Sequence, residues 1–101
     1  MKLQGAFTAL ITPFQRGAVN EAALRRLIRR QIKAGTNGLV PCGSTGEAAT
    51  LHPHEYRRVI EITVEEAGGK IPVVPGVGTN STDKTVAQAR QVAAWGADAL
   101  L

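Results

Sequence analysis

The sequence predicts an α/β fold built on a parallel sheet. Three short apolar segments, residues 5–11, 38–42 and 71–75, have the composition of buried β-strands. Each of them precedes a segment whose apolar residues recur at helical spacing. Glycine-rich turns follow the second and third segments. This alternation gives the order βαβαβαβ, which is typical of a parallel sheet with right-handed crossovers.

The first strand is expected to end at Thr12-Pro13, because proline interrupts a strand. A turn at residues 15–17 leads to a helix that Asn20 caps and Gly35 ends. Basic residues occupy the outer faces of this helix, alternating with aliphatic ones: Arg25, Arg26, Arg29, Arg30 and Lys33. No aromatic side chain lies among them to stack on bases. We therefore interpret them as a solvated helix face and expect no nucleic-acid binding.

The second and third helices have clear boundaries. Residues 47–51 are ambiguous and allow at most one helical turn. The second helix starts at His52-Pro53, with proline at its first position and Glu55 at the third, and ends at Gly68-Gly69. The third helix begins near residues 80–82 and ends at Gly96. Its expected inward side chains are Val86, Ala89, Val92 and Ala93.

Composition limits the class of protein. The 101 residues carry a net charge of +4, and 44% of them are hydrophobic, as in ordinary globular proteins. Cys42 is the single cysteine, so no internal disulfide forms and a reducing cytoplasm is expected. One cysteine and the two histidines, His52 and His54, are too few to assemble a metal cluster, so none is expected. No apolar run is long enough for a signal peptide or a membrane span.

Residues 97–101 have the character of an opening fourth strand with no turn behind it. A finished domain rarely stops inside a core element. We expect the chain to be the amino-terminal portion of a longer protein. A complete four-stranded, flavodoxin-like unit is the alternative.

The turn Gly43-Ser44-Thr45-Gly46-Glu47 is the main candidate for a functional site. Its two glycines allow close approach to the backbone, so two hydroxyls and their N–H groups can face a small anion. Ligands of α/β folds bind at the carboxyl ends of strands, where this turn lies. A tight connection with capping hydroxyls explains the same residues equally well.

Three motifs in order carry a family resemblance: Ala9-Leu10-Ile11-Thr12-Pro13-Phe14, Gly43-Ser44-Thr45-Gly46-Glu47 and Gly76-Val77-Gly78-Thr79-Asn80-Ser81-Thr82. Together they resemble the dihydrodipicolinate synthase family of pyruvate-dependent class I aldolases. The resemblance covers residues 5–101 and implies a (β/α)₈ TIM barrel, which needs about 250 residues. Residues 1–101 would form an incomplete TIM-barrel domain, with three βα units and the start of strand 4.

The resemblance also implies a reaction. Pyruvate forms a Schiff base with a lysine and is then condensed with L-aspartate semialdehyde in the diaminopimelate route of lysine biosynthesis. This 4-hydroxy-tetrahydrodipicolinate synthase chemistry needs no cofactor, and family members are usually homotetramers. The family's lysine lies on the sixth strand, beyond Leu101. None of the chain's own lysines matches it, so we expect the chain alone to be inactive: Lys2, Lys33, Lys70 and Lys84.

Two residues take roles from the resemblance. Ser44 stands where the family places a hydroxyl, often threonine, that relays a proton. A serine keeps the donor and acceptor, but it lacks the methyl that restricts χ1. Thr45 matches the residue that hydrogen-bonds the pyruvate carboxylate. Glu47 is expected to act through backbone hydrogen bonds, and Cys42 to be a small apolar residue rather than a nucleophile.

Alternatives to the synthase remain open. Ser44 also fits the pattern of N-acetylneuraminate lyase, whereas residues 78–82 resemble the synthase. A small non-catalytic α/β module that binds an anion is a second alternative, and a fragment that only self-associates is a third.

Feedback by lysine is expected to be weak or absent. In the family's lysine site, Asn80 is retained, but Tyr56 replaces a histidine and Lys84 replaces an acidic residue. The ammonium group of a bound lysine would meet the like charge of Lys84.

Overall fold

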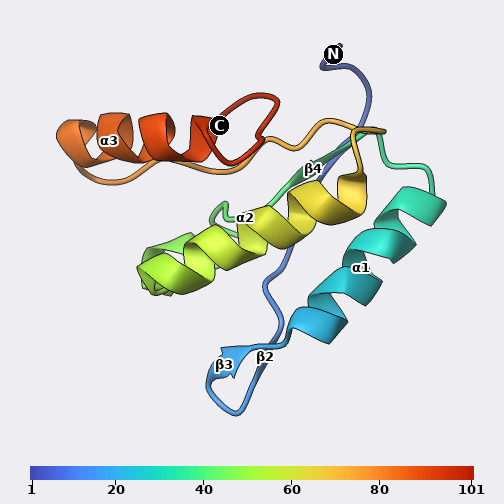
Figure 1. Cartoon of the computed structure of the whole chain (residues 1–101), viewed down its shortest axis with the longest axis horizontal. Coiled ribbons are helices and arrows are strands. Elements are labelled where there is room, and N and C mark those ends of the chain that lie inside the picture. Colours follow the sequence, from blue (N-terminus) through green and yellow to red (C-terminus); the bar gives the residue numbers. More distant parts are fainter.

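A computed structural model describes all of residues 1–101. Figure 1 shows the helices beside a small sheet, with α2 between α1 and α3 in this view. The elements in chain order are β1 (Phe7–Ala9), β2 (Phe14–Gln15), β3 (Ala18–Val19), α1 (Glu21–Lys33), β4 (Gly38–Val40), the 3₁₀ turn η1 (Ala48–Thr50), α2 (Pro53–Ala67) and α3 (Thr82–Ala93).

The parallel sheet is confirmed. Strands β1 and β4 pair in parallel, with Phe7 opposite Gly38. Val73 adds a parallel bridge to Leu39. The predicted third strand over residues 71–75 is otherwise irregular, and its sequence gives the reason. Pro72 and Pro75 have no N–H group, so this segment cannot donate a full ladder of hydrogen bonds.

The last segment lies beside the third, as the predicted strand order requires. The Asp98 N–H donates to the Val73 carbonyl at 2.9 Å, and the Leu101 N–H donates to the Pro75 carbonyl at 3.0 Å. The Asp98 carboxylate also accepts the Val73 N–H at 2.9 Å. Residues 97–101 nevertheless do not form a regular strand.

The amino-terminal part differs from the prediction in two respects. The first strand spans Phe7–Ala9 rather than residues 5–11. Residues 14–19 form an unpredicted antiparallel hairpin, β2–β3. The predicted turn is confirmed at its centre, where Arg16 and Gly17 have left-handed backbones with φ of 53° and 77°. Two consecutive residues with positive φ are typical of the tight hairpin turn that matches strand twist.

The helix boundaries follow their capping residues. The Asn20 side chain accepts the Ala23 N–H at 3.0 Å, which caps α1 as predicted. Pro53 begins α2, and the Glu55 carboxylate accepts the His52 N–H at 2.9 Å. Among the candidate caps for α3, the structure selects Ser81, whose hydroxyl accepts the Lys84 N–H at 3.3 Å. These capping residues act on neighbours within a few positions, so the helix boundaries could be predicted from the sequence.

The core lies between the sheet and the inner faces of α1 and α2. Its fully buried side chains include Leu10, Leu24, Ile28, Leu39, Ile60, Ile62 and Val73. The predicted inward face of α3 is only partly correct. Val92 is buried and Ala89 half-buried, but Val86 is 45% exposed and Ala93 is also exposed. No element of the structure covers the side of α3 that carries Val86.

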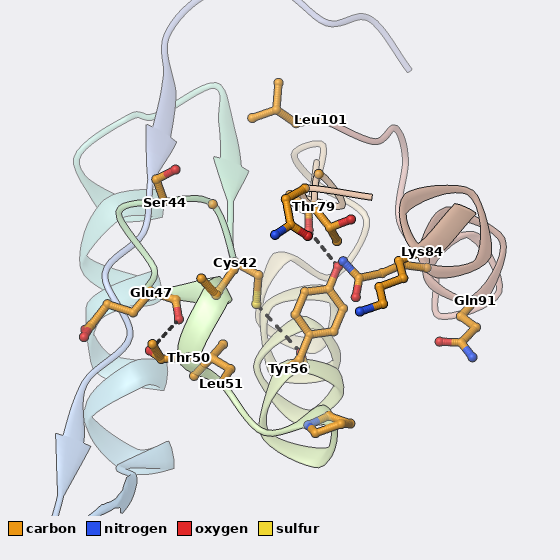
Figure 2. A pocket seen from close by; sticks show the side chains of 18 of the residues that line it. Cys42, Ser44, Glu47, Thr50, Leu51, Tyr56, Thr79, Lys84, Gln91 and Leu101 are labelled. Atoms are coloured by element: carbon orange, nitrogen blue, oxygen red, sulfur yellow. Dashed lines mark hydrogen bonds between the residues drawn. The ribbon is translucent and has the colours of Figure 1, made fainter. Parts of the chain in front are cut away.

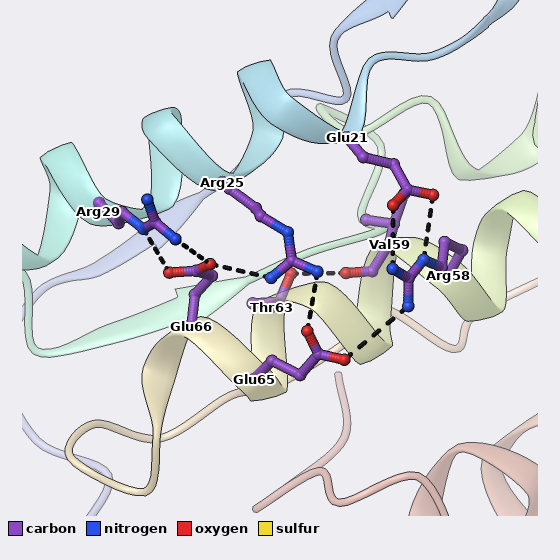
Figure 3. Close-up of polar contacts among 8 residues, drawn as sticks. All are labelled: Glu21, Arg25, Arg29, Arg58, Val59, Thr63, Glu65 and Glu66. Atoms are coloured by element: carbon purple, nitrogen blue, oxygen red, sulfur yellow. Dashed lines mark hydrogen bonds and ion pairs between the residues drawn. The ribbon is translucent and has the colours of Figure 1, made fainter.

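A network of ion pairs joins α1 to α2 (Figure 3). Arg25 binds Glu66 at 2.9 Å and Glu65 at 2.8 Å, and Arg29 binds Glu66 at 2.7 Å. Glu21 receives two hydrogen bonds of 3.0 Å from Arg58. Part of the basic face predicted to be solvated therefore binds the neighbouring helix. None of the three helices is long and apolar enough to cross a membrane.

Candidate functional site

The candidate turn begins where β4 ends. Two successive turns close it, because the Gly46 N–H donates to the Gly43 carbonyl at 3.1 Å and the Glu47 N–H donates to the Ser44 carbonyl at 3.0 Å. The N–H groups of Ser44 and Thr45 have no acceptor within the chain. The turn therefore presents two free backbone donors beside two hydroxyls, as the sequence suggested.

Gly46 holds the turn against the first strand. A Cβ at this position would lie 3.1 Å from the Leu10 carbonyl oxygen and from the Cys42 nitrogen, so a larger residue would push the turn outward. The buried Thr12 hydroxyl donates to the Gly46 carbonyl at 2.7 Å. Residues that follow β1 thus position a turn more than thirty residues away.

A groove of about 1000 Å³ lies between this turn, the start of α2, the segment after Val77 and α3 (Figure 2). Ser44 lines the groove and Thr45 does not, although both are exposed. In Figure 2, Ser44 lies on the turn, well apart from Lys84 and Gln91 on the opposite side. The two predicted site residues are adjacent on one exposed turn, and Ser44 alone reaches the groove.

Cys42 enters the turn with a left-handed backbone, at φ 57°. It is 2% exposed, and burial raises the pKa of its thiol to about 12. A thiol with this pKa stays protonated at neutral pH. The two histidines stack on each other, with ring centroids 5.7 Å apart, and neither hydrogen-bonds the thiol. These features agree with a structural rather than a nucleophilic cysteine.

Tyr56 lies on the first turn of α2, and its hydrogen bond to Gly76 was not predicted from the sequence. Its buried hydroxyl donates to the Gly76 carbonyl at 2.6 Å. Burial raises the pKa of this phenol well above its usual value, so it is a stable donor. Tyr56 stands at helical spacing from Val59, Ile60 and Thr63, but nothing in the sequence identifies a hydroxyl partner twenty residues away.

The other residues singled out from sequence are distributed around the groove. Glu47 has a left-handed backbone at φ 60°, and its carbonyl accepts the Thr50 N–H at 3.1 Å, which agrees with a structural role. Asn80 and Lys84 line the groove, whereas Lys2, Lys33 and Lys70 do not. No three His, Cys, Asp or Glu side chains lie together as a metal ion would require.

A parallel sheet whose strand ends carry an exposed, glycine-bracketed turn belongs to the α/β class that binds ligands at its carboxyl edge. Comparison with known proteins specifies the group within that class. The chain belongs to the dihydrodipicolinate synthetase family, whose model matches residues 2–101.

Curated relatives are similar along the whole chain. A 4-hydroxy-tetrahydrodipicolinate synthase from Bradyrhizobium diazoefficiens is 51% identical over 100 residues, which are 99% of this chain and 34% of the relative. The enzyme of that name from Methylobacterium radiotolerans is also 51% identical over 100 residues, which are 99% of this chain and 33% of that enzyme. The chain thus spans about a third of the length of the curated relatives it matches.

Solved structures show the same fold. The dihydrodipicolinate synthase of Thermotoga maritima has a TM-score of 0.93 and 40% identity over 95% of this chain and 32% of its own. The chloride-inhibited dihydrodipicolinate synthase of Acinetobacter baumannii, complexed with pyruvate, has a TM-score of 0.94 and 36% identity over 98% of this chain and 34% of its own. The fold is the amino-terminal part of a (β/α)₈ barrel, as the resemblance implied.

Proposed function

We propose that the protein carrying this chain is a 4-hydroxy-tetrahydrodipicolinate synthase. It is a Schiff-base lyase that condenses pyruvate with L-aspartate semialdehyde in lysine biosynthesis, acting in the cytoplasm as a homotetramer. The observation that carries this proposal is the exposed turn at the end of β4, which places two hydroxyls beside two unpaired N–H groups. The names of relatives about half identical along the whole chain support it.

Thr45 binds the pyruvate carboxylate in this proposal. A carboxylate is best held by several hydrogen-bond donors, and charge-assisted bonds of this kind are about twice as strong as neutral ones. The Thr45 hydroxyl and the free N–H groups of Ser44 and Thr45 supply such donors. The pyruvate complex of the Acinetobacter baumannii relative supports pyruvate as the ligand.

Ser44 relays a proton in this proposal. Its hydroxyl can donate one proton and accept another, which is the requirement for a relay. Because Ser44 adjoins Thr45, a bound keto acid lies within reach of both. The amine that forms the Schiff base is none of Lys2, Lys33, Lys70 or Lys84.

Trapping of the Schiff base tests the proposal. The gene product that carries this sequence is expressed at its natural length, incubated with pyruvate and treated with borohydride. We expect one stable adduct by mass spectrometry, on a lysine other than these four, and consumption of both substrates in a steady-state assay. The 101-residue polypeptide, treated alike, is expected to form none. An adduct on any of these four lysines would contradict the assignment.

Substitutions in the turn test the two roles. Thr45→Val removes the hydroxyl at nearly constant volume and is expected to weaken pyruvate binding about tenfold, as the loss of a hydrogen bond to a charged group does. Ser44→Ala is expected to lower kcat by a factor of about 100 or more, the contribution of a positioned proton donor. Unchanged kinetics in both variants would place the site elsewhere.

Weak feedback by lysine belongs to the same proposal. Tyr56 is buried, and its hydroxyl is occupied by the Gly76 carbonyl, while Lys84 supplies the charged side chain of the groove beside α3. Glu47, the one acidic residue that lines the groove, lies on the candidate turn, so the part of the groove beside α3 offers no carboxylate to the ammonium of a bound lysine. We expect no inhibition of the natural-length protein by submillimolar lysine in a steady-state assay. Lys84→Glu is the informative variant, since it restores a carboxylate and should increase inhibition.

A further inference from the structure

Gly76 connects Tyr56 to the candidate turn through short contacts made by the two peptide groups on either side of its Cα. On one side, its carbonyl accepts the Tyr56 hydroxyl at 2.6 Å. On the other, its N–H donates to the Pro41 carbonyl at 3.0 Å, directly before the turn. A Cβ on Gly76 would clash with the Cys42 carbonyl and lie 3.0 Å from the Gly43 Cα. Gly76 therefore packs directly on the backbone that enters the turn.

A second contact joins Tyr56 to the same place. The Cys42 thiol approaches the Tyr56 carbonyl at 3.8 Å, so the backbone of α2 meets the residue that enters the turn. The ring itself is fixed by Trp95, which meets it edge-on with centroids 6.1 Å apart. Figure 2 shows the phenol beside Cys42, on the groove side of the turn.

From these contacts we infer that Tyr56 is a positioning residue for the Ser44–Thr45 turn. Its hydroxyl fixes the carbonyl of Gly76, and Gly76 in turn packs on Pro41, Cys42 and Gly43. These residues directly precede Ser44 and Thr45, which carry the two free N–H groups. Tyr56 does not touch the ligand of the turn. It sets the direction of the donors that do.

The inference rests on the proposed function only in its choice of ligand, which is pyruvate. Tyr56→Phe removes the hydroxyl and keeps the ring, so its packing on Trp95 is retained. In the natural-length protein we expect pyruvate to bind about fivefold more weakly, as the loss of one hydrogen bond allows. The dissociation constant is measured by calorimetry, and circular dichroism verifies the fold.

A matched control separates positioning from loss of stability. Thr63 lies on the same helix, and its buried hydroxyl also donates to a carbonyl, that of Val59, at 2.7 Å. Thr63→Val removes this bond far from the turn. We expect it to leave the pyruvate dissociation constant unchanged.

Coupling between sites is the decisive readout. If Tyr56 acts through the turn, the effects of Tyr56→Phe and Thr45→Val on pyruvate binding are less than additive in the double variant. Gly76→Ala perturbs the same residue where it packs on Cys42 and Gly43, with Tyr56 intact, and is expected to weaken binding without adding to Tyr56→Phe. If Tyr56→Phe does not fold, Gly76→Ala combined with Thr45→Val tests the same coupling.

The outcomes distinguish the two proposals. If Thr45→Val does not affect pyruvate binding, the role of the turn fails, and the proposed function loses its main support. If Thr45→Val weakens binding but Tyr56→Phe has no effect, or adds to it fully, the turn binds pyruvate and the positioning role of Tyr56 is wrong. An equal effect of Thr63→Val would likewise overturn it.

Discussion

At the scale of single residues, two glycines are required by neighbours rather than by their own backbone angles. Gly46 packs against the first strand, and Gly76 packs against the backbone of Cys42. Neither has a left-handed backbone. Gly76 has no room for a side chain because a segment distant in the sequence packs on it, whereas Gly46 meets both the distant Leu10 and the nearby Cys42.

We expect Gly76→Ala to destabilise the protein by about 1 to 3 kcal/mol, because an added methyl must displace backbone and not a flexible side chain. Urea unfolding measures the change. Gly78→Ala is the control, since nothing lies within 4 Å of the added Cβ there. Equal stability of the two variants would show that Gly76 packs less tightly on Cys42 than these distances require.

The candidate site was only partly predictable from the sequence, because some of its contacts join segments that are distant in the chain. Ser44 and Thr45 lie in a contiguous motif at the end of an apolar segment, so local pattern was enough to select them. The partner of the Tyr56 hydroxyl was not predictable. It depends on how α2 packs against the third segment, and Gly76 looks from sequence like one of several turn glycines.

At the scale of elements, the helices were predictable and the smallest strands were not. Caps such as Asn20 and Ser81 act within three residues, so they are visible in the sequence. The strands of the β2–β3 hairpin have two residues each, too few to show a period of two. Val86 was misplaced because helical spacing identifies an apolar face but not what covers it.

The α1–α2 network makes an element-scale prediction about pH. Hydrogen bonds from Arg29 and Arg25 lower the pKa of the Glu66 carboxyl from its usual 4.5, and Arg58 does the same for Glu21. A lowered native pKa means that the stabilisation is complete above the usual value and is lost as the pH falls through the native one. We expect the free energy of unfolding to decrease as the pH falls below about 4.5.

Glu66→Gln tests the origin of this decrease. It is expected to reduce stability at neutral pH by about 1 kcal/mol, the scale of a surface network, and less at high salt. It should also flatten the acid limb of the stability curve. Glu61→Gln is the control, because Glu61 contacts only Arg57 on its own helix, at 3.6 Å. An acid limb unchanged by Glu66→Gln would assign the pH dependence to other carboxylates.

At the scale of the whole molecule, the buried core is small and several large apolar side chains are open. Only 22 of 101 residues are buried, which leaves little area to oppose chain entropy. Ile11, Phe14, Val86, Leu100 and Leu101 are each at least 39% exposed. The parallel sheet also has open edges, which favour pairing with other chains.

We therefore expect the isolated 101-residue polypeptide to self-associate. Sedimentation velocity should show species larger than 10.7 kDa that grow with concentration. Val86→Lys, which changes an exposed position outside the core, should reduce the association. A concentration-independent monomer with a cooperative unfolding transition would contradict this expectation and favour an independent small module.

The arrangement of Trp95 gives the molecule an optical reporter. This indole is the chain's single tryptophan, and it meets the single tyrosine edge-on while the Arg57 guanidinium lies 5.1 Å from its ring centroid. Excitation energy absorbed by Tyr56 passes efficiently to Trp95 while the indole, just after α3, stays against the start of α2. The emission of the unmodified polypeptide thus follows the opening of this junction, the same junction that borders the groove, without any attached dye.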